Sequence, residues 1–178
     1  MADTSSRQRA LELWSEAYRH HMRALALAAE DKQETAGEEM SRAIGLYSMS
    51  LDLCPTAEAY TFRGWAYNAL GRVDDAIEEC KRAIEVDPDF GNPYNDIGAY
   101  LIAKGELDDA IEWLEKAKTA PRYEPRHYPY INLGRLYAAK GMVVKSIEQF
   151  EQALEFAPDA EAKVSIESAL AQLRSVLN

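Results

Sequence analysis

The sequence predicts an all-α protein built from antiparallel helix hairpins that follow one another along the chain. Three observations support this prediction. In residues 57–90, apolar and small residues are spaced by three, four or seven positions, which places them on one face of each of two helices. Gly71 follows the first of these helices and Pro88 ends the second, as expected for a tight turn and a helix stop. The same pattern then recurs further along the chain.

The recurrence has a period near 34 residues. Three small residues return at intervals of 34 and then 36 positions: Gly64, Gly98 and Gly134; Gly71, Gly105 and Gly141; and Ala83, Ala117 and Ala153. In the other direction, Pro88 corresponds to Pro55 and Ala76 to Ala43, both 33 positions earlier. Amphipathic helices that arose by coincidence would not repeat their small residues in register.

With this period and pattern, the chain resembles the tetratricopeptide repeat family over roughly residues 36–160. The resemblance implies a right-handed α-solenoid with about four hairpins and a C-terminal capping helix. We expect one domain over residues 1–178, with an atypical N-terminal hairpin at 6–56, repeats at 57–90, 91–126 and 127–160, and the capping helix at 161–178.

The N-terminal hairpin departs from the repeat pattern. Residues 6–31 predict one long helix, and residues 1–5 are expected to fray. Residues 31–35 are polar and predict a turn, after which residues 36–53 form the second helix. The first helix has an apolar stripe of Leu11, Trp14, Tyr18, Met22, Leu25 and Ala29; the second is expected to bury Met40, Ala43, Ile44, Tyr47 and Leu51.

The regular hairpins have predicted helices at 57–70 and 73–86, 91–104 and 107–118, and 127–140 and 143–156. Residues 119–126 form a junction two residues longer than the period allows. A final helix is predicted from residue 158 to about 177, with one apolar side that covers the last hairpin and a polar side that faces water.

Composition limits the classes of function. The chain has 178 residues, of which 47% are hydrophobic, but no run of about 18 apolar residues and no apolar signal core at its start. We therefore expect no membrane insertion. Two lone cysteines form no disulfide framework, and Cys80 falls at a packing position, so we expect a cytoplasmic protein with a buried thiol.

The net charge of −10 and the pI near 4.8 disfavour binding to nucleic acid. The charge is uneven: residues 73–90 contain seven acids against two bases, and residues 122–145 contain five bases against one acid. We interpret the acids as a solvated face; the basic stretch is either the same or a surface that orients a partner.

The sequence shows no catalytic constellation. His20 and His21 point about 100° apart on a helix and cannot hold one metal ion as an i, i+4 pair would. There is no Cys-x-x-Cys, phosphate-binding glycine loop or Gly-x-Ser-x-Gly elbow. The acid pairs Asp74-Asp75 and Asp108-Asp109 begin second helices, where they favour the helix dipole. We expect neither enzymatic activity nor a metal or other cofactor.

In stacked hairpins the first helices line an inner groove that commonly binds peptide segments. The inward positions are Glu58, Thr61, Trp65 and Asn68; Asn92, Asn95, Ala99 and Ile102; and Tyr128, Ile131, Arg135 and Ala138, with Asn132 at the side. From these we select a peptide-binding set of Trp65, Asn68, Asn92, Asn95, Tyr128, Asn132 and Arg135. Asparagine can hold a peptide backbone, the two aromatics can anchor apolar side chains, and Arg135 can pair with a carboxylate.

Two narrower resemblances can be tested by position. Co-chaperones that grip the acidic tails of heat-shock chaperones have lysine, asparagine and arginine at positions that here hold Thr61, Trp65, Asp96, Tyr128 and Asn132, so that clamp is rejected. The segment EPRHYPYINLGRLYAAKG, residues 124–141, looks like the third-repeat region of the small acidic chaperones that hold type III secretion translocators, which are bacterial and cytoplasmic.

The leading hypothesis is therefore a non-catalytic adaptor that binds a peptide segment of a partner protein in its concave groove. One alternative is a secretion-type chaperone for a hydrophobic client. Another is a self-assembling scaffold unit, with a possible homo-oligomer, which the long first helix motivates.

Overall fold

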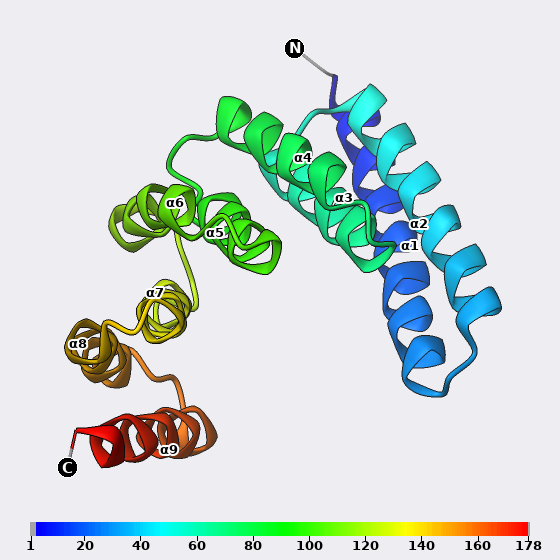
Figure 1. Ribbon diagram of the computed structural model, residues 1–178. Helices are drawn as coiled ribbons and strands as arrows, with labels where there is room; N and C mark the ends of the chain where they lie inside the picture. The colour runs from blue at the N-terminus through cyan, green and yellow to red at the C-terminus, as the bar shows by residue number, and fades with distance from the viewer. Residues whose placement is uncertain (1–2, 178) are drawn as a thin grey trace. The chain divides into compact units, whose positions relative to one another are not determined.

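The computed structural model describes residues 3–177, which form nine α-helices and one isolated β-bridge between Phe90 and Arg122 (Figure 1). The all-α prediction is confirmed over these residues. The chain divides into two compact units, Met1–Pro88 and Asp89–Asn178, and each is described by itself.

The first unit contains two hairpins of unequal length. Its helices are α1 (Thr4–Ala29), α2 (Gln33–Leu53), α3 (Ala57–Ala69) and α4 (Val73–Val86). Helix α1 packs along α2, α3 packs along α4, and α3 also contacts both α2 and α1. Figure 1 shows that α1 and α2 are much longer than α3 and α4. With 26 residues against 13, α1 is about 39 Å long and α3 about 20 Å.

The second unit contains two hairpins and a final single helix. Its helices are α5 (Asn92–Lys104), α6 (Leu107–Thr119), α7 (Tyr128–Ala139), α8 (Val143–Glu155) and α9 (Ala160–Val176). Helix α7 contacts α6 and α5, and α9 packs on α8. Ile166 and Leu170 of α9 bury themselves against Phe150 and Ala153 of α8. The expectation that one side of the last helix covers the last hairpin is confirmed.

In every hairpin, a small residue on the first helix packs against a buried triplet on the second. The first and third residues of the triplet are small, and its central residue is Tyr, Cys, Leu or Phe. A Cβ on Gly98 would lie 2.5 Å from Leu114 Cγ, and one on Gly134 would lie 2.7 Å from the Phe150 ring. Both distances are shorter than non-bonded carbons allow, so only glycine permits the observed approach of the helices. The triplets are fully or almost fully buried: Ala43, Tyr47 and Ser50; Ala76, Cys80 and Ala83; Ala110, Leu114 and Ala117; and Ser146, Phe150 and Ala153.

The tight turns of the three regular hairpins depend on glycine, as predicted. Gly71, Gly105 and Gly141 have φ values of 75°, 81° and 71°, in the left-handed region that side chains disfavour. At the turn between α1 and α2, Asp31 takes the same conformation with φ 61°. Asp tolerates this region better than most residues because its short side chain can bond locally.

Several predicted helix ends are wrong by one to three residues. Helix α1 begins at Thr4 and not residue 6, because the Asp3 carboxylate accepts a hydrogen bond from the Ser6 backbone N–H at 2.7 Å. Thr4 and Ser5 are therefore helical, while Met1 and Ala2 lie outside the described residues. Helix α2 begins at Gln33 because the turn before it needs only three residues, with Asp31 at positive φ.

The last helix begins at Ala160 and not at residue 158, because Asp159 is its N-cap and accepts from the Ala162 N–H at 2.8 Å. The long junction after α6 is anchored by backbone bonds. The Arg122 N–H donates to the Asp89 carbonyl at 3.0 Å and the Gly91 N–H donates to the Arg122 carbonyl at 2.9 Å. Tyr123 is buried in this junction against Gly91.

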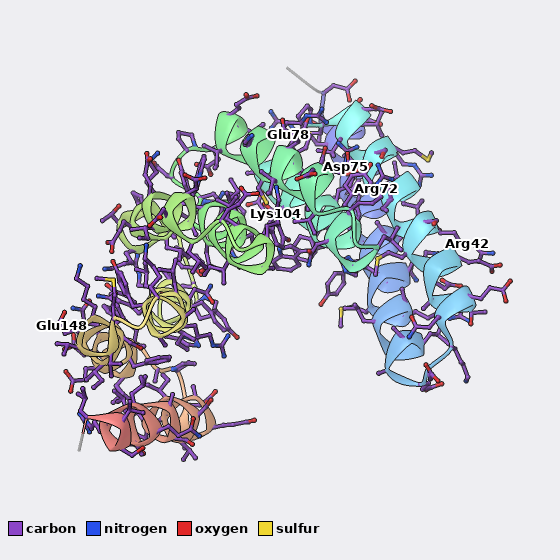
Figure 2. All side chains as sticks on the ribbon, viewed as in Figure 1. Arg42, Arg72, Asp75, Glu78, Lys104 and Glu148 are labelled. Carbon is purple, nitrogen blue, oxygen red and sulfur yellow. The ribbon has the colours of Figure 1, made fainter. Side chains whose placement is uncertain are left out.

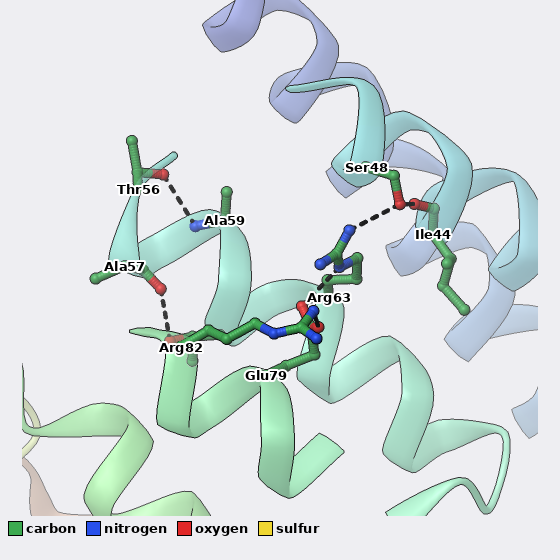
Figure 3. Close-up of polar contacts among 9 residues, drawn as sticks. Ile44, Ser48, Thr56, Ala57, Ala59, Arg63, Glu79 and Arg82 are labelled. Atoms are coloured by element: carbon green, nitrogen blue, oxygen red, sulfur yellow. Dashed lines mark hydrogen bonds and ion pairs between the residues drawn. The ribbon is translucent and has the colours of Figure 1, made fainter. Parts of the chain in front are cut away.

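A polar network joins α2, α3 and α4 inside the first unit (Figure 3). Arg63 of α3 donates to the Glu79 carboxylate at 2.6 Å and to the Ser48 hydroxyl at 2.9 Å, and Arg82 donates to Glu79 at 2.8 Å. The Arg63 and Glu79 side chains are only 12% and 4% exposed. The network fixes α3 between its two neighbours because each buried charge has a partner.

The exposed charges form local pairs instead. In Figure 2, Arg72 and Asp75 lie together at the start of α4, with 2.7 Å between Nε and Oδ2. Asp74 and Asp75 both lie in the first turn of α4, and Asp108 and Asp109 in that of α6, where negative charge is favoured by the helix dipole.

Candidate functional site

Five of the seven predicted site residues lie on the first helices of the second unit. Asn92 and Asn95 belong to α5, and Tyr128, Asn132 and Arg135 belong to α7. The other two, Trp65 and Asn68, belong to α3 of the first unit. The candidate site is therefore built from the residues of the second unit.

The two asparagines Asn95 and Asn132 join α5 to α7. The Asn132 side-chain amide donates to the Asn95 carbonyl oxygen at 2.9 Å. Asn95 is 9% exposed, and Asn132 is half-buried. A carboxamide has four hydrogen-bonding positions, so the half-buried Asn132 retains the capacity to bind a further group. Their first role is structural, since they set the spacing of the two helices.

Tyr128 projects from the first turn of α7 and is 47% exposed. Its ring lies 4.3 Å from the ring of His127, which is buried. Both residues line a hollow of about 360 Å³, the Tyr128 hollow, together with Pro125, Ile131, Arg135, Pro158, Asp159, Glu161, Ala162 and Ser165. The lining combines apolar and aromatic side chains with the carboxylates of Asp159 and Glu161 at the start of α9.

Arg135 lies two turns after Tyr128 on α7 and lines a second hollow as well. This Leu173 hollow, of about 250 Å³, is lined by Arg135, Ala138, Phe150, Ala169, Gln172, Leu173 and Val176. The two hollows thus follow α7 and α9 with Arg135 common to both. Sequence reasoning chose Arg135 but missed the contribution of α9, which was read only as a cap. The small residues Ala162, Ser165 and Ala169 along one side of α9 were the sequence feature that could have indicated its contribution to the hollows.

The basic stretch of residues 122–145 contains one base that is unengaged among the described residues. Lys140 forms an ion pair with Asp108, and Arg126 lies 3.6 Å from Glu124. The cations of Arg122 and Lys145 lie over the rings of Phe90 and Tyr137. Arg135 is exposed and has no such partner within residues 3–177. An unpaired guanidinium between two hollows is suited to a carboxylate.

Comparison with known protein families identifies the same repeated hairpins. One model of the tetratricopeptide repeat matches residues 57–90, and a second matches residues 92–122 and 128–160, which together are more than half of the chain. The chain belongs to the tetratricopeptide repeat family. The matched segments are α3–α4, α5–α6 and α7–α8, and α1 and α2 lie before them.

Relatives contain tetratricopeptide repeats within longer chains. The chain is 31% identical over 91 residues to small glutamine-rich tetratricopeptide repeat-containing protein 2 of Mycosarcoma maydis, which is 51% of this chain and 26% of that protein. It is 31% identical to the heat-shock protein cognate co-chaperone sgt12 of Aspergillus fumigatus, over 51% of this chain and 27% of that one. The chain thus spans about a quarter of the length of these curated relatives.

Solved structures share the tetratricopeptide fold at low identity. PilF of Pseudomonas aeruginosa superimposes with a TM-score of 0.66 at 19% identity, over 89% of this chain and 68% of that chain. MamA superimposes with a TM-score of 0.59 at 22% identity, over 80% of this chain and 86% of that chain. These similarities confirm the tetratricopeptide solenoid fold.

In the tetratricopeptide hairpin of the first unit, the predicted inward residues divide between core and surface. Thr61 lies in the core, at 1% exposure, and its hydroxyl donates to the Ala57 carbonyl at 2.8 Å. Its assignment to the inward surface is therefore wrong. Trp65 is half-buried with its ring 4.6 Å from that of Phe62, and Asn68 is exposed near the end of α3.

Before the first tetratricopeptide hairpin, the apolar stripe of α1 is largely on the surface. Leu11, Tyr18, Met22 and Leu25 are 57%, 38%, 47% and 43% exposed. Beside its N-terminal half is a hollow of about 500 Å³ lined by Arg7, Ala10, Leu11, Trp14, Ser50, Cys54, Thr56 and Glu58. The sequence identified the stripe, but its exposure follows from the short length of α3, which cannot cover a helix twice as long.

His20 and His21 have separate partners in the N-terminal hairpin. His20 lies 2.5 Å from the Glu39 carboxylate, and this hydrogen bond holds the pKa of Glu39 below its usual value. His21 is buried, which lowers its pKa, and its Nδ1 lies 3.5 Å from the Tyr47 hydroxyl. Among the described residues, no group of three His, Cys, Asp or Glu side chains is arranged to hold a metal ion. No helix within residues 3–177 is long and apolar enough to span a membrane.

Proposed function

We propose that the chain is a non-catalytic adaptor that binds a peptide segment of a partner protein along α7 and α9. The observation that carries this proposal is the position of Arg135, an exposed guanidinium without an ion-pair partner among the described residues, between two hollows. A carboxylate on the peptide pairs with Arg135, and an apolar side chain next to it enters the Leu173 hollow.

Tyr128 and Asn132 complete the proposed site. The exposed ring of Tyr128 offers area for a second apolar or prolyl side chain at little cost in conformational entropy. Asn132 holds the peptide backbone, because a carboxamide can donate to a carbonyl and accept from an N–H. Asn95 acts through Asn132, since its carbonyl oxygen accepts the hydrogen bond that orients the Asn132 amide. Asn92 lies half-buried in the first turn of the same helix as Asn95 and extends the polar surface.

The comparisons support a protein partner, because family relatives include a heat-shock protein cognate co-chaperone and Hsp70-Hsp90 organizing protein 3 of Arabidopsis thaliana. The local chemistry argues for a peptide other than an acidic heat-shock tail. A tail that carries several carboxylates would meet Asp96, and the lysine position of the clamp is filled by the buried Thr61. Both cysteines are free, which supports the proposal of a reducing, cytoplasmic setting.

The experiment is a selection of peptides from a random display library on the full chain, followed by affinity measurement on the enriched peptides. We expect enriched peptides to contain Asp or Glu next to an apolar residue. Arg135→Ala is expected to weaken their binding by tenfold or more, because a charge-assisted bidentate pair is lost. Tyr128→Ala is expected to weaken binding to a smaller extent.

The control is Lys145→Ala, which removes an exposed cation of the same unit from α8. It should leave the affinity unchanged, and none of the three variants should change the thermal unfolding of the chain by more than a few degrees. Enriched peptides that bind Arg135→Ala as tightly as the natural sequence would reject the proposed site.

A further inference from the structure

We propose that the exposed stripe of α1 binds the same stripe of a second copy of this chain, antiparallel and about a two-fold axis at Tyr18. This surface belongs to the first unit and is independent of the peptide site on α7 and α9. Trp14 and Tyr18 at the centre of the stripe contact the Phe62 ring of α3, with ring centroids 5.1 and 5.6 Å apart. Leu11, Met22 and Leu25 towards its ends remain exposed, because α3, at 13 residues, covers only part of the 26-residue α1. Single exposed apolar residues are ordinary, but four along one face of one helix need a partner.

The spacing of the stripe is symmetric about its centre. Counted from Tyr18, Trp14 and Met22 lie four residues before and after, and Leu11 and Leu25 lie seven before and after. All five project within a narrow sector of the helix, since these steps are close to whole helical turns. When two such helices pair antiparallel about Tyr18, Leu11 of one copy faces Leu25 of the other and Trp14 faces Met22. A two-fold interface requires this kind of self-complementarity.

The shape of the surface is also complementary to itself. The N-terminal half of α1 borders the hollow of about 500 Å³ that Leu11, Trp14 and Cys54 help to line. The C-terminal half instead presents the exposed Met22 and Leu25. In the antiparallel register, Met22 and Leu25 of each copy come opposite the hollow of the other, so both hollows are filled at once. Apolar side chains that protrude from one half thus have a concave apolar site in the other half.

The charges beside the stripe favour the same register. Arg7 borders the hollow and has no ion-pair partner among residues 3–177. The residue opposite Arg7 is residue 29, which places Glu30 and Asp31 of the second copy near the Arg7 guanidinium. Glu12, which pairs with Arg9 of its own chain at 3.0 Å, comes opposite residue 24 of the second copy, beside Arg23. The carboxylate near Arg23 in its own chain is that of Glu39, at 3.9 Å. Each of these contacts between the copies occurs twice in the dimer and joins opposite charges. A parallel pairing would instead place each charged residue beside the identical residue of the second copy.

Sedimentation over protein concentrations from about 1 to about 300 μM tests the association of the full chain. We expect the average mass to rise from 20.0 kDa towards twice that value. Leu25→Glu should raise the dissociation constant at least tenfold, because it places a charge in the apolar hollow of the other copy. The matched control is Val164→Glu, which introduces the same charge at a more exposed apolar residue of α9 and should leave the association unchanged.

A charge exchange tests the register. Glu12→Arg and Arg23→Glu are each expected to weaken the dimer, since each places like charges opposite one another. The double variant restores the two opposite-charge contacts and should recover most of the affinity. This recovery distinguishes the antiparallel register from any contact in which residues 12 and 23 do not meet.

Crosslinking tests the two-fold axis. In a chain with Cys54→Ser and Cys80→Ala, we expect Tyr18→Cys to form a disulfide-linked dimer on mild oxidation. A residue on the two-fold axis lies close to the same residue of the second copy, as a disulfide requires. Met49→Cys, at a more exposed position on α2, should not do so. A mass of 20.0 kDa at every concentration, or a dimer that Leu25→Glu leaves intact, would overturn the proposal. Because Arg135→Ala leaves α1 unchanged, its effect on peptide binding is scored separately.

Discussion

The N-terminal hairpin and the three repeat hairpins reach the same helix–helix contact with different residues. In α3–α4, α5–α6 and α7–α8, a glycine on the first helix meets Cys80, Leu114 or Phe150 on the second. In α1–α2, Ala17 takes the place of the glycine and packs with Ala43 and Tyr47. All of these residues except Phe150, at 5%, are completely inaccessible or nearly so. The difference shows that the crossing requires a small residue, Gly or Ala, on the first helix, while the residue opposite it on the second helix varies from Cys to Phe or Tyr.

The largest expected effect tests how much each crossing depends on its large residue. Phe150→Ala should lower the free energy of unfolding by about 3–5 kcal/mol, because it removes an aromatic ring packed between α7, α8 and α9. Cys80→Ala at the equivalent position should cost only about 1 kcal/mol, since one buried atom is lost. Urea denaturation followed by circular dichroism measures both. Equal costs would contradict the dependence of each crossing on the size of its central residue.

The second comparison concerns the buried carboxylates. Glu79→Gln should lower the free energy of unfolding by about 3 kcal/mol, because the Arg63 guanidinium, 12% exposed, loses its ionic partner. Glu39 of the N-terminal hairpin pairs with His20 and lies near Arg23 and Arg42, all of which are more exposed than Arg63. Glu39→Gln should therefore cost clearly less than Glu79→Gln in the same denaturation experiment. The reverse order would mean that Arg63 is solvated when Glu79 is neutral.

Exchange of the small residues at the crossings should give intermediate effects. Gly98→Ala is expected to cost about 2 kcal/mol, because its Cβ would lie 2.5 Å from the Leu114 side chain, and the gain in helix propensity only partly offsets the clash. Ala17→Gly should cost about 1 to 2 kcal/mol, because helix propensity falls and a buried methyl group that packs with Ala43 and Tyr47 is lost. Thermal unfolding of the two variants measures this difference. A neutral Gly98→Ala would indicate that α5 and α6 can separate without loss of stability.

The turns should respond in opposite directions. Gly105→Ala forces a side chain into the left-handed region and should cost about 1 kcal/mol, whereas Asp31→Gly relieves that strain and should gain about 0.5 kcal/mol. Both residues are exposed, so neither change disturbs the core. Unfolding midpoints in urea measure the two shifts, and Glu30→Gly next to Asp31 serves as a control that should not stabilise. Stabilisation by Glu30→Gly would remove the argument from backbone conformation.

These comparisons show which features of the fold and of the candidate site can be predicted from the sequence. The glycines at 64, 98 and 134 and at 71, 105 and 141 predicted the crossings and turns, because their spacing is fixed by helix geometry. The sequence did not predict the burial of Thr61 or the pairing of Asn95 with Asn132, since both depend on the position of neighbouring helices. For the same reason, the sequence predicted Arg135 as a binding residue from its type and position on the helix. The hollows beside it could not be predicted, because they depend on where α9 lies.

The smallest expected effect separates the two buried histidines by pH. Burial lowers the pKa of His21, and burial also lowers that of His127, where the charges of Asp159 and Glu124 oppose the shift. In the unfolded chain each histidine takes up a proton as the pH falls through about 6.5, while the folded chain does so only at lower pH. Stability should therefore be highest above pH 6.5 and decline between pH 7 and pH 5.

The pH dependence should be weaker in His21→Gln, which keeps a polar group near Tyr47 but does not titrate. His127→Gln should reduce the dependence less, because nearby carboxylates already favour the protonated form of His127. Urea midpoints at several pH values between 5 and 7 measure the two slopes. The low pKa of Glu39 does not interfere, since its contribution is lost only below about 4.5. If His21→Gln retained the full slope, the protons would be taken up elsewhere and the burial of His21 would not limit stability in acid.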